Sequence, residues 1–175
     1  MPLAGFGPLP DQNRRWPDPR RRGRHALASL FVVTATTLWE AALAASNMRW
    51  YAGLVKPTFA PSPWVAAAVS AALAALLALA FFRVLCRPDY LPDRPGAIRL
   101  FLVALGLDAA WAWLFFAGRH PSLALAVAAA LAITAAAATW RFVVVDLRAG
   151  LMLLPWTFAT AFVFLLDLSI ALRNG

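Results

Sequence analysis

The sequence predicts an all-α membrane protein, a bundle of five transmembrane helices. Its 175 residues are 62% hydrophobic and only 14% charged, and their mean hydropathy is +0.70. A soluble domain usually has about half apolar and about one quarter charged residues. The sequence also contains five apolar runs of the roughly 20 residues that a helix needs to cross a bilayer. We therefore expect most of the apolar surface to face lipid.

The five predicted spans follow one another with short connectors. They are residues 26–46, 64–85, 97–117, 122–145 and 149–172. Lipid offers no hydrogen-bond partner to a backbone, so each span is expected to be a helix. Five helices of a soluble bundle would carry polar stripes at helical spacing. The run AAAVSAALAALLALAFF of the second span has none.

The N-terminal region differs in composition from the rest of the chain. Residues 1–25 contain five prolines and six arginines. Such a segment can hardly bury a core. We predict a disordered basic cytoplasmic tail here, followed by a single five-helix domain over residues 26–175.

The basic residues predict the orientation of the chain. Of the 16 lysines and arginines, twelve lie in the tail or beside the second and fourth connectors, and four lie at the opposite ends of the spans. By the positive-inside rule, the N-terminus is cytoplasmic and the C-terminus lies outside. The bias toward alanine and arginine is typical of a GC-rich genome and indicates a bacterial cell membrane. Topology also explains the net charge of +8, so we expect no nucleic-acid partner.

Three acidic residues lie inside predicted spans: Glu40, Asp108 and Asp167. Each would cost about 2.5–3.5 kcal/mol at the middle of a membrane, so each is either functional or turned to a polar partner inside the bundle. The three occupy the first, third and fifth spans, which run in the same direction, at or beyond the midpoint of each. We therefore expect them in the outer half of the bundle, beside the first connector.

Helical spacing places aromatic residues on the faces of two of these acids. Asp108, Trp111 and Phe115 follow one another at i, i+3 and i+7, and Trp156 lies eleven residues, three turns, before Asp167. If these faces point inward, they form a mostly apolar ligand pocket with a few polar groups. Alternatively, the tryptophans form an interfacial belt and the acids hydrogen-bond neighbouring helices.

The first connector, WYAGLVKPTFAPSPW, is rich in aromatic residues and proline. Its prolines, Pro57 among them, make it stiff and interrupt helical structure. We expect Trp50, Tyr51, Phe59 and Trp64 to pack over the helix ends as a lid. Lys56 then offers a cation at the mouth, either to an anionic group of a ligand or to one of the acids. The alternative is an anchor at the level of the lipid headgroups.

Neither a metal nor a bound cofactor is expected. His25 and His120 are far apart in the sequence and are predicted to lie on opposite sides of the membrane. The sequence contains no glycine-rich phosphate loop of the kinds that mark nucleotide sites.

Four stretches resemble one known family. WYAGLVKPTFAPSPWV resembles the WYxxLxKPxFxPPxWVF motif of the TspO/MBR family, the tryptophan-rich sensory proteins. LDAAWAWLFFAGRH resembles the LNxxWSxxFF segment of the third family helix. VDLRAGLMLLPW and LDLSIALRN resemble the beginning and the end of the fifth. The resemblance covers roughly residues 26–174.

This resemblance implies a five-helix bundle, often a homodimer, with a pocket closed by the first loop. The ligands it implies are porphyrins, haem-like tetrapyrroles or other hydrophobic molecules, none of them a required cofactor. The lid motif falls on Trp50, Tyr51, Lys56, Pro57 and Trp64, while Trp111 matches the pocket-side tryptophan of the third helix. Close helix packing in a dimer is permitted by the small residues Gly106 and Ala110.

The sequence also departs from the family pattern. Ser70 and Ala159 stand where the family has the tryptophans tied to porphyrin breakdown in some bacterial members, so we do not expect an enzyme. Asp108 and Asp167 stand where asparagine is typical, which predicts a more acidic pocket.

Three functions follow from these observations. The first is a membrane-bound sensory protein that binds a tetrapyrrole-like ligand. The second is a small transporter, proton-coupled through Glu40, Asp108 and Asp167, because acids inside a membrane mark proton relays. The third, less favoured, is a porphyrin-degrading enzyme.

Overall fold

The computed structural model describes residues 19–174, which are almost entirely helical and contain no strand. In this part of the chain, five helical segments are long and apolar enough to cross a membrane. These segments are α1 (Pro19–Ser46), α3 (Pro63–Leu85), α4 (Arg94–Ala112) with the π-helical turn η1 (Trp113–Ala117), α5 (Pro121–Val145) and α6 (Leu147–Asn174). The prediction of an all-α, five-helix membrane bundle is confirmed.

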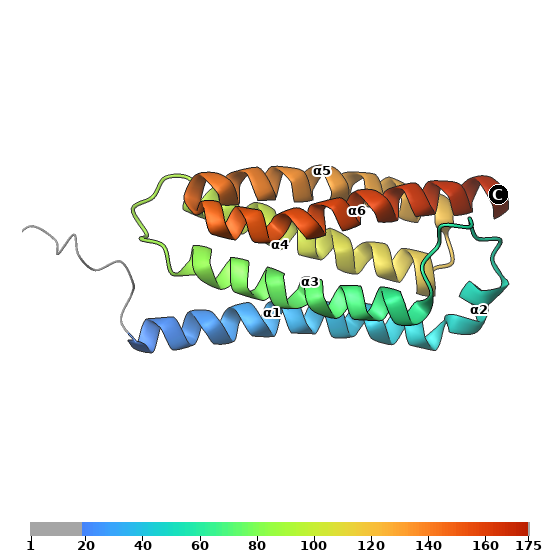
Figure 1. Cartoon of the computed structure of the whole chain (residues 1–175), viewed down its shortest axis with the longest axis horizontal. Coiled ribbons are helices and arrows are strands. Elements are labelled where there is room, and N and C mark those ends of the chain that lie inside the picture. Colours follow the sequence, from blue (N-terminus) through green and yellow to red (C-terminus); the bar gives the residue numbers. More distant parts are fainter. Residues whose placement is uncertain (1–18, 175) are drawn as a thin grey trace, which may run out of the picture.

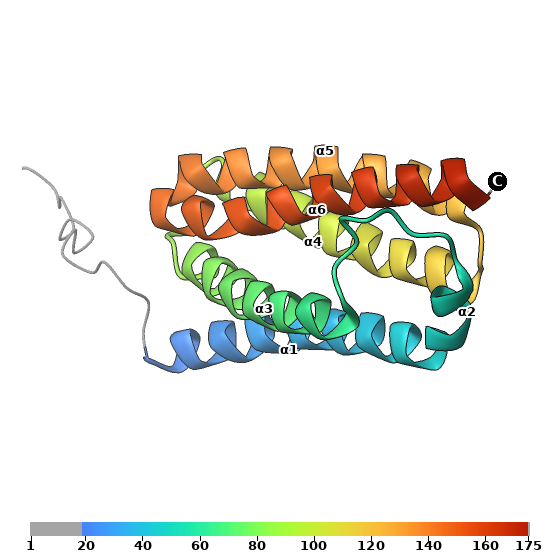
Figure 2. The same cartoon turned by 45° about the vertical axis from the view of Figure 1, so that its right-hand side comes forward.

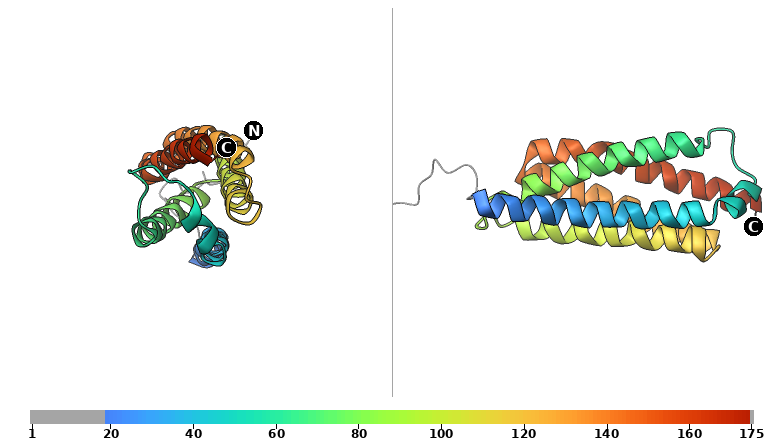
Figure 3. Two further views of the ribbon diagram at one scale, coloured as in Figure 1. Left: turned by 90° about the vertical axis from the view of Figure 1, so that its right-hand side faces the viewer. Right: turned by 90° about the horizontal axis from the view of Figure 1, so that it is seen from below.

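The long helices form a closed ring, which the end-on view shows (Figure 3, left). Helix α1 contacts α3 and α4, α6 contacts α3 and α5, and α5 contacts α4. One end of the bundle, the lid end, carries the short helix α2 (Met48–Gly53), the turn after η1 and the end of α6 (Figure 1). The opposite end, the arginine end, carries the beginning of α1, the α3–α4 connector and the bend between α5 and α6.

Helix starts are marked by proline. Pro19, Pro63 and Pro121 begin α1, α3 and α5, where the missing N–H removes a donor that would have no helical partner anyway. The side chain of Ser62 caps α3 by accepting a hydrogen bond from the Val65 backbone N–H at 3.5 Å. The first helix begins seven residues before the predicted boundary, because arginine is a good helix former. Residues 1–18 of the predicted tail lie outside the described residues.

The first connector is only partly irregular. Its beginning forms α2, since its prolines start only at Pro57. The following loop, residues 54–62, runs from α2 toward α6 and returns to the start of α3 (Figure 2).

The end of α4 widens into η1. The Gly118 N–H donates to the Trp113 carbonyl oxygen at 2.8 Å, which closes the wider turn. A Cβ atom at Gly118 would lie 2.9 Å from the Leu114 carbonyl oxygen, so glycine is needed here. Arg119 then adopts a φ of 54° and reverses the chain. Single π-turns inside helices frequently occur at functional sites.

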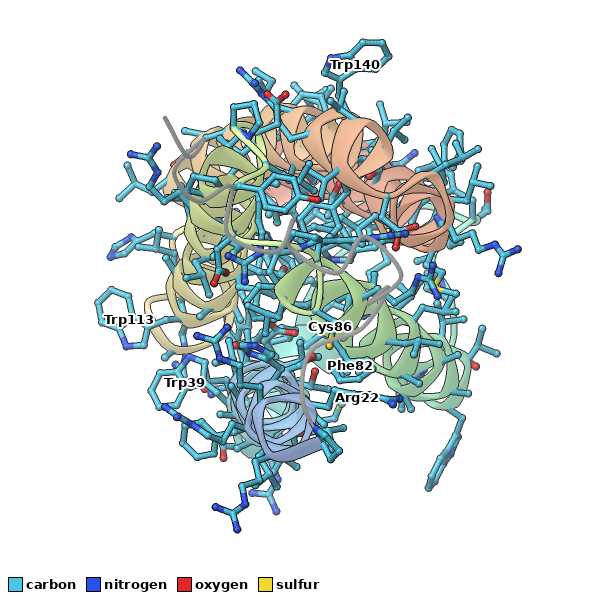
Figure 4. All side chains as sticks on the ribbon, turned by 90° about the vertical axis from the view of Figure 1, so that its left-hand side faces the viewer. Arg22, Trp39, Phe82, Cys86, Trp113 and Trp140 are labelled. Carbon is cyan, nitrogen blue, oxygen red and sulfur yellow. The ribbon has the colours of Figure 1, made fainter. Side chains whose placement is uncertain are left out.

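The interior of the bundle combines phenylalanine with alanine. Phe101 stacks on Phe81 at a centroid distance of 4.6 Å and also contacts Phe142 at 5.4 Å. Fully buried alanines on four helices let the backbones approach around these rings: Ala80, Ala97, Ala104, Ala135, Ala138 and Ala149. The outer surface is apolar too, and Trp39, Trp113 and Trp140 point away from the bundle (Figure 4). This distribution suits a helix bundle surrounded by lipid.

A buried acid ties three helices together at the arginine end. Asp146, between α5 and α6, accepts from Arg83 Nη2 at 2.9 Å and Arg87 Nη2 at 2.8 Å, both near the end of α3. Its Oδ1 also accepts from the Arg148 backbone N–H at 3.0 Å, at the beginning of α6. Burial by itself would raise the pKa of Asp146, but the hydrogen bonds and charges of Arg83 and Arg87 hold it below its ordinary value.

Candidate functional site

The lid helix α2 closes on the π-turn through aromatic contacts. The Trp50 ring meets the Phe115 ring edge-on, with centroids 5.6 Å apart at 72°. Tyr51 contacts Phe115 at 6.3 Å and Phe116 at 6.0 Å. Phe115 is 2% exposed. The lid and the π-turn therefore share one aromatic cluster in this structure.

Trp111 joins this cluster to a buried acid across the bundle. Its ring lies nearly parallel to Phe115, with centroids 5.8 Å apart at 25°. Its indole Nε1–H donates to Asp167 Oδ2 of α6 at 2.5 Å. Asp167 is 1% exposed. Burial and the nearby charge of Asp167 raise the pKa of the Tyr51 hydroxyl, so this phenol stays protonated beside the acid.

A second indole–carboxylate pair joins the same two helices in the opposite sense. Trp156 of α6 donates its Nε1–H to Asp108 Oδ2 of α4 at 3.4 Å. Trp156 also contacts Phe101 at a centroid distance of 6.1 Å. On α4 the two bonded residues are about 4.5 Å apart along the axis, but on α6 they are about 16.5 Å apart. The two pairs thus diverge from α4 toward α6, along a stretch that contains the buried Thr160.

The third acid, Glu40 of α1, has one carboxyl oxygen without such a donor among the described residues. Its Oε1 atom is buried, and no hydrogen-bond partner reaches it within residues 19–174. Glu40 lies close enough to Asp108 for the two carboxyl groups to interact electrostatically. The structure therefore brings Glu40 and Asp108 together and places Asp167 separately, beside Trp111 and the lid.

Lys56 is directed to the lid itself. Its ammonium group donates to the carbonyl oxygens of Tyr51 at 2.8 Å, and of Ala52 and Leu54 at 3.2 Å each. Its Nζ also lies 4.7 Å from the centroid of the Tyr51 ring. These carbonyls are at the C-terminal end of α2, where a cation is favourable. The predicted cation for a ligand thus serves as a cap of the lid helix.

A pocket of about 380 Å³ opens between α2 and the start of α3. Its walls are made by the lid residues Met48, Tyr51, Ala52, Lys56, Pro57, Ala60, Pro61, Ser62 and Pro63. This volume lies within the range of small-molecule sites. Trp64 does not contribute to these walls: it is 86% exposed on the first turn of α3.

The structure adds partners that the sequence does not reveal, among them the residue that Phe59 of the predicted lid contacts. Phe59 connects the lid loop to α6: its ring packs edge-on against the Phe162 ring, with centroids 6.0 Å apart. Phe116 extends the cluster of Phe115. Its place next to Phe115 in the sequence was the signal that could have indicated this. For Phe162 no signal was available, because α6 carries several phenylalanines and their spacing does not tell which one meets the lid.

The described residues contain no group of three His, Cys, Asp or Glu side chains that could hold a metal ion. His25 begins α1 at the arginine end and His120 precedes α5 at the lid end. The site is thus built from aromatic rings, indole donors and carboxyl groups.

Comparisons with known proteins agree with this architecture. The TspO/MBR family profile matches residues 27–173. A tryptophan-rich sensory protein of Cereibacter sphaeroides is 31% identical over 108 residues, which cover 62% of this chain and 66% of that relative. The match therefore spans slightly less than two thirds of the relative's length. Because the profile extends over all five long helices, the chain belongs to the TspO/MBR family and is a multi-pass membrane protein.

Proposed function

We propose that the protein binds a hydrophobic, tetrapyrrole-like ligand, a porphyrin or haem, beneath the first-loop lid and acts as a sensory protein. The observation that carries this proposal is the shared cluster of Trp50, Tyr51, Phe115 and Trp111. A flat aromatic ligand can replace these ring contacts with ring contacts of its own, each of which contributes about 0.5–1.5 kcal/mol beyond area burial. The lid must lift for the ligand to enter.

Tryptophan fluorescence of the detergent-purified protein, titrated with protoporphyrin IX in the dark, tests the proposal. With inner-filter correction, we expect saturable quenching that Trp111→Phe weakens. The matched control is Trp113→Phe, because Trp113 is two residues away but 51% exposed on the outer surface. Absence of saturable quenching, or equal effects of the two substitutions, would contradict a site at the cluster.

We further propose that the bound porphyrin is not degraded. Ser70, one of the two residues that replace family tryptophans, is exposed on α3, and Ala159, the other, is small. Neither supplies an aromatic group to the interior. The same sample is then illuminated: an intact porphyrin spectrum supports binding without chemistry, and bleaching faster than in protein-free micelles would identify an enzyme.

A proton-coupled transporter is the second candidate. It rests on the buried Oε1 of Glu40, which lacks a hydrogen-bond partner among the described residues and lies near Asp108. Asp108→Asn and Asp167→Asn separate the candidates, since a ligand site tolerates an amide whereas a proton relay does not. Ligand uptake by proteoliposomes under a pH gradient, abolished by these substitutions while porphyrin quenching persists, would favour the transporter.

We also propose a homodimer that packs through α4. Gly106 and Ala110, one turn apart, are both exposed on this helix, and a Cβ added at Gly106 would meet no atom within 4 Å. Their small size permits close approach of a second copy. Gly106→Leu is expected to lower the mass of the detergent-solubilised particle from dimer to monomer in light scattering.

A further inference from the structure

The arginine end contains a second pocket that the proposed function does not use. It has a volume of about 310 Å³ and is lined by Arg21, Arg24, His25, Ala28 and Asp89. The first four residues belong to α1, and Asp89 belongs to the α3–α4 connector. The pocket therefore lies where the first helix meets a loop that is distant in the sequence.

This pocket has surplus positive charge. Its carboxylate, Asp89, is already engaged by Arg94 Nη1 at 2.7 Å and by Arg21 Nη1 at 3.5 Å. Arg94 is held in place by donating to the carbonyl oxygens of Val84 and Leu85. Arg24 has no carboxylate partner among residues 19–174. Within the described residues, the pocket thus offers an anion a guanidinium group that has no carboxylate partner.

Neighbouring Arg22 does not line this pocket. It extends from α1 toward Phe82 and Cys86 at the end of α3 (Figure 4). Of the arginines at the start of α1, Arg22 thus extends toward α3, whereas Arg21 and Arg24 line the pocket.

The length of α1 places the pocket at the membrane surface. Its 28 residues extend about 42 Å, whereas the hydrocarbon core of a bilayer is about 30 Å thick. The first turns of α1 therefore project to the depth of the lipid headgroups.

Below the pocket, α1 presents an apolar face to lipid. Arg24, Leu27 and Phe31 follow one another at i, i+3 and i+7, which is one side of a helix. Leu27 is 71% exposed and Phe31 is 75% exposed. A cation at headgroup depth and an apolar strip beneath it match the two parts of a phospholipid.

We propose that this pocket is a binding site for one anionic phospholipid. The headgroup phosphate lies between Arg21 and Arg24, whose guanidinium groups donate charge-assisted hydrogen bonds to its oxygens. The acyl chains lie along Leu27 and Phe31. Asp89 limits the affinity, since its negative charge competes with the phosphate for Arg21.

Native mass spectrometry of the full chain in detergent, titrated with phosphatidylglycerol, tests this binding site. Arg24→Gln is expected to weaken binding of the first lipid about fivefold, the effect of one basic residue at an anionic membrane surface. The matched control, Arg99→Gln, removes an exposed arginine of α4 at the same end and is expected to leave binding unchanged. Asp89→Asn is expected to strengthen binding.

Four results would overturn the proposal. Equal weakening by Arg24→Gln and Arg99→Gln would show diffuse surface charge. Binding of phosphatidylcholine as tightly as phosphatidylglycerol would show that the site does not recognise the negative charge of the headgroup. Displacement of the lipid by millimolar inorganic phosphate would show a site for the free anion. Unchanged binding in Arg24→Gln would overturn it as well. Circular dichroism and thermal unfolding of each variant establish that it is folded.

Discussion

Two tryptophans and two aspartates form two of the polar connections across the interior of the bundle. An indole N–H can only donate and a carboxylate oxygen can accept, so each pair gives the indole its one acceptor and gives the carboxyl group one donor. Asp167 is almost completely buried and receives its bond from Trp111. Asp167, one of the two acids that depart from the family pattern, is thus held by Trp111, which matches that pattern. This indicates that the two positions act as one unit.

Trp111→Phe removes the donor and leaves Asp167 buried without it. We expect a loss of about 1–3 kcal/mol in the free energy of unfolding, the cost of a buried polar group without a partner. Trp113→Phe, on the outer surface, is expected to change it by less than about 0.5 kcal/mol. Denaturant titration in detergent, followed by circular dichroism, measures both. Equal effects would show that the Trp111–Asp167 bond contributes little to stability.

At the scale of elements, α2 depends on its surroundings. A helix of six residues is not stable alone in water. Two devices hold it: the aromatic contacts of Trp50 and Tyr51 with η1, and the three hydrogen bonds that Lys56 donates to the carbonyls at its end. Since the cap and the loop anchor Phe59 belong to the same connector, the lid is expected to open as one piece.

Lys56→Met keeps the apolar stem but removes the cap. We expect amide hydrogen exchange over residues 48–60 to become about tenfold faster, which corresponds to about 1.5 kcal/mol for lost hydrogen bonds to a charged group. Arg49→Met, which removes the other cation of this connector, serves as the control and should leave exchange unchanged. If Lys56→Met also leaves it unchanged, the aromatic contacts alone hold the lid.

The junction at Asp146 connects α3 to the bend between α5 and α6. Asp146→Asn leaves Arg83, which is 16% exposed, without its counter-charge. We expect destabilisation by about 3 kcal/mol, as for other broken buried ion pairs. Asp93→Asn is the control, because its pair with Arg141 is partly exposed, with side chains 37% and 49% accessible, and such pairs contribute about 0–1 kcal/mol.

The same junction predicts a dependence on pH. The folded pKa of Asp146 lies below its ordinary value. Its contribution to stability is therefore complete above the pKa of the unfolded carboxyl and is lost as the pH falls through the folded pKa. Thermal unfolding of the wild type should show this acid loss, and Asp146→Asn should reduce it. An identical pH profile in the variant would contradict the assignment.

For the whole molecule, hydropathy and length are sufficient to predict the five long helices and their order, because a membrane span must satisfy its own backbone. The rotation of each helix is not predictable in this way. Trp64 belongs to the aromatic motif of the lid, yet it faces outward on α3. Lys56 has a chemistry suited to a ligand, but its target depends on how the chain folds back after α2. The partners Trp111 and Asp167 are 56 residues apart, so only the packed bundle reveals their bond.

The distribution of charge predicts the topology of the whole molecule. Ten arginines of the described residues gather at the arginine end, and five spans place the two chain ends on opposite sides of the membrane. We expect a reporter active only outside the cytoplasm to be silent when fused at the N-terminus and active when fused at the C-terminus. The reverse pattern would contradict the orientation.

The π-turn η1 can also be viewed as a one-residue insertion at the end of a membrane helix. A loop can absorb an extra residue, but inside an α-helix each added residue rotates everything after it by about 100°. The wider turn at Trp113–Ala117 absorbs the extra residue, so the rotation is confined to these five residues. We therefore expect relatives with an uninterrupted α-helix here to show a single-residue gap when aligned with this chain. Their Phe115 position would be turned away from the lid.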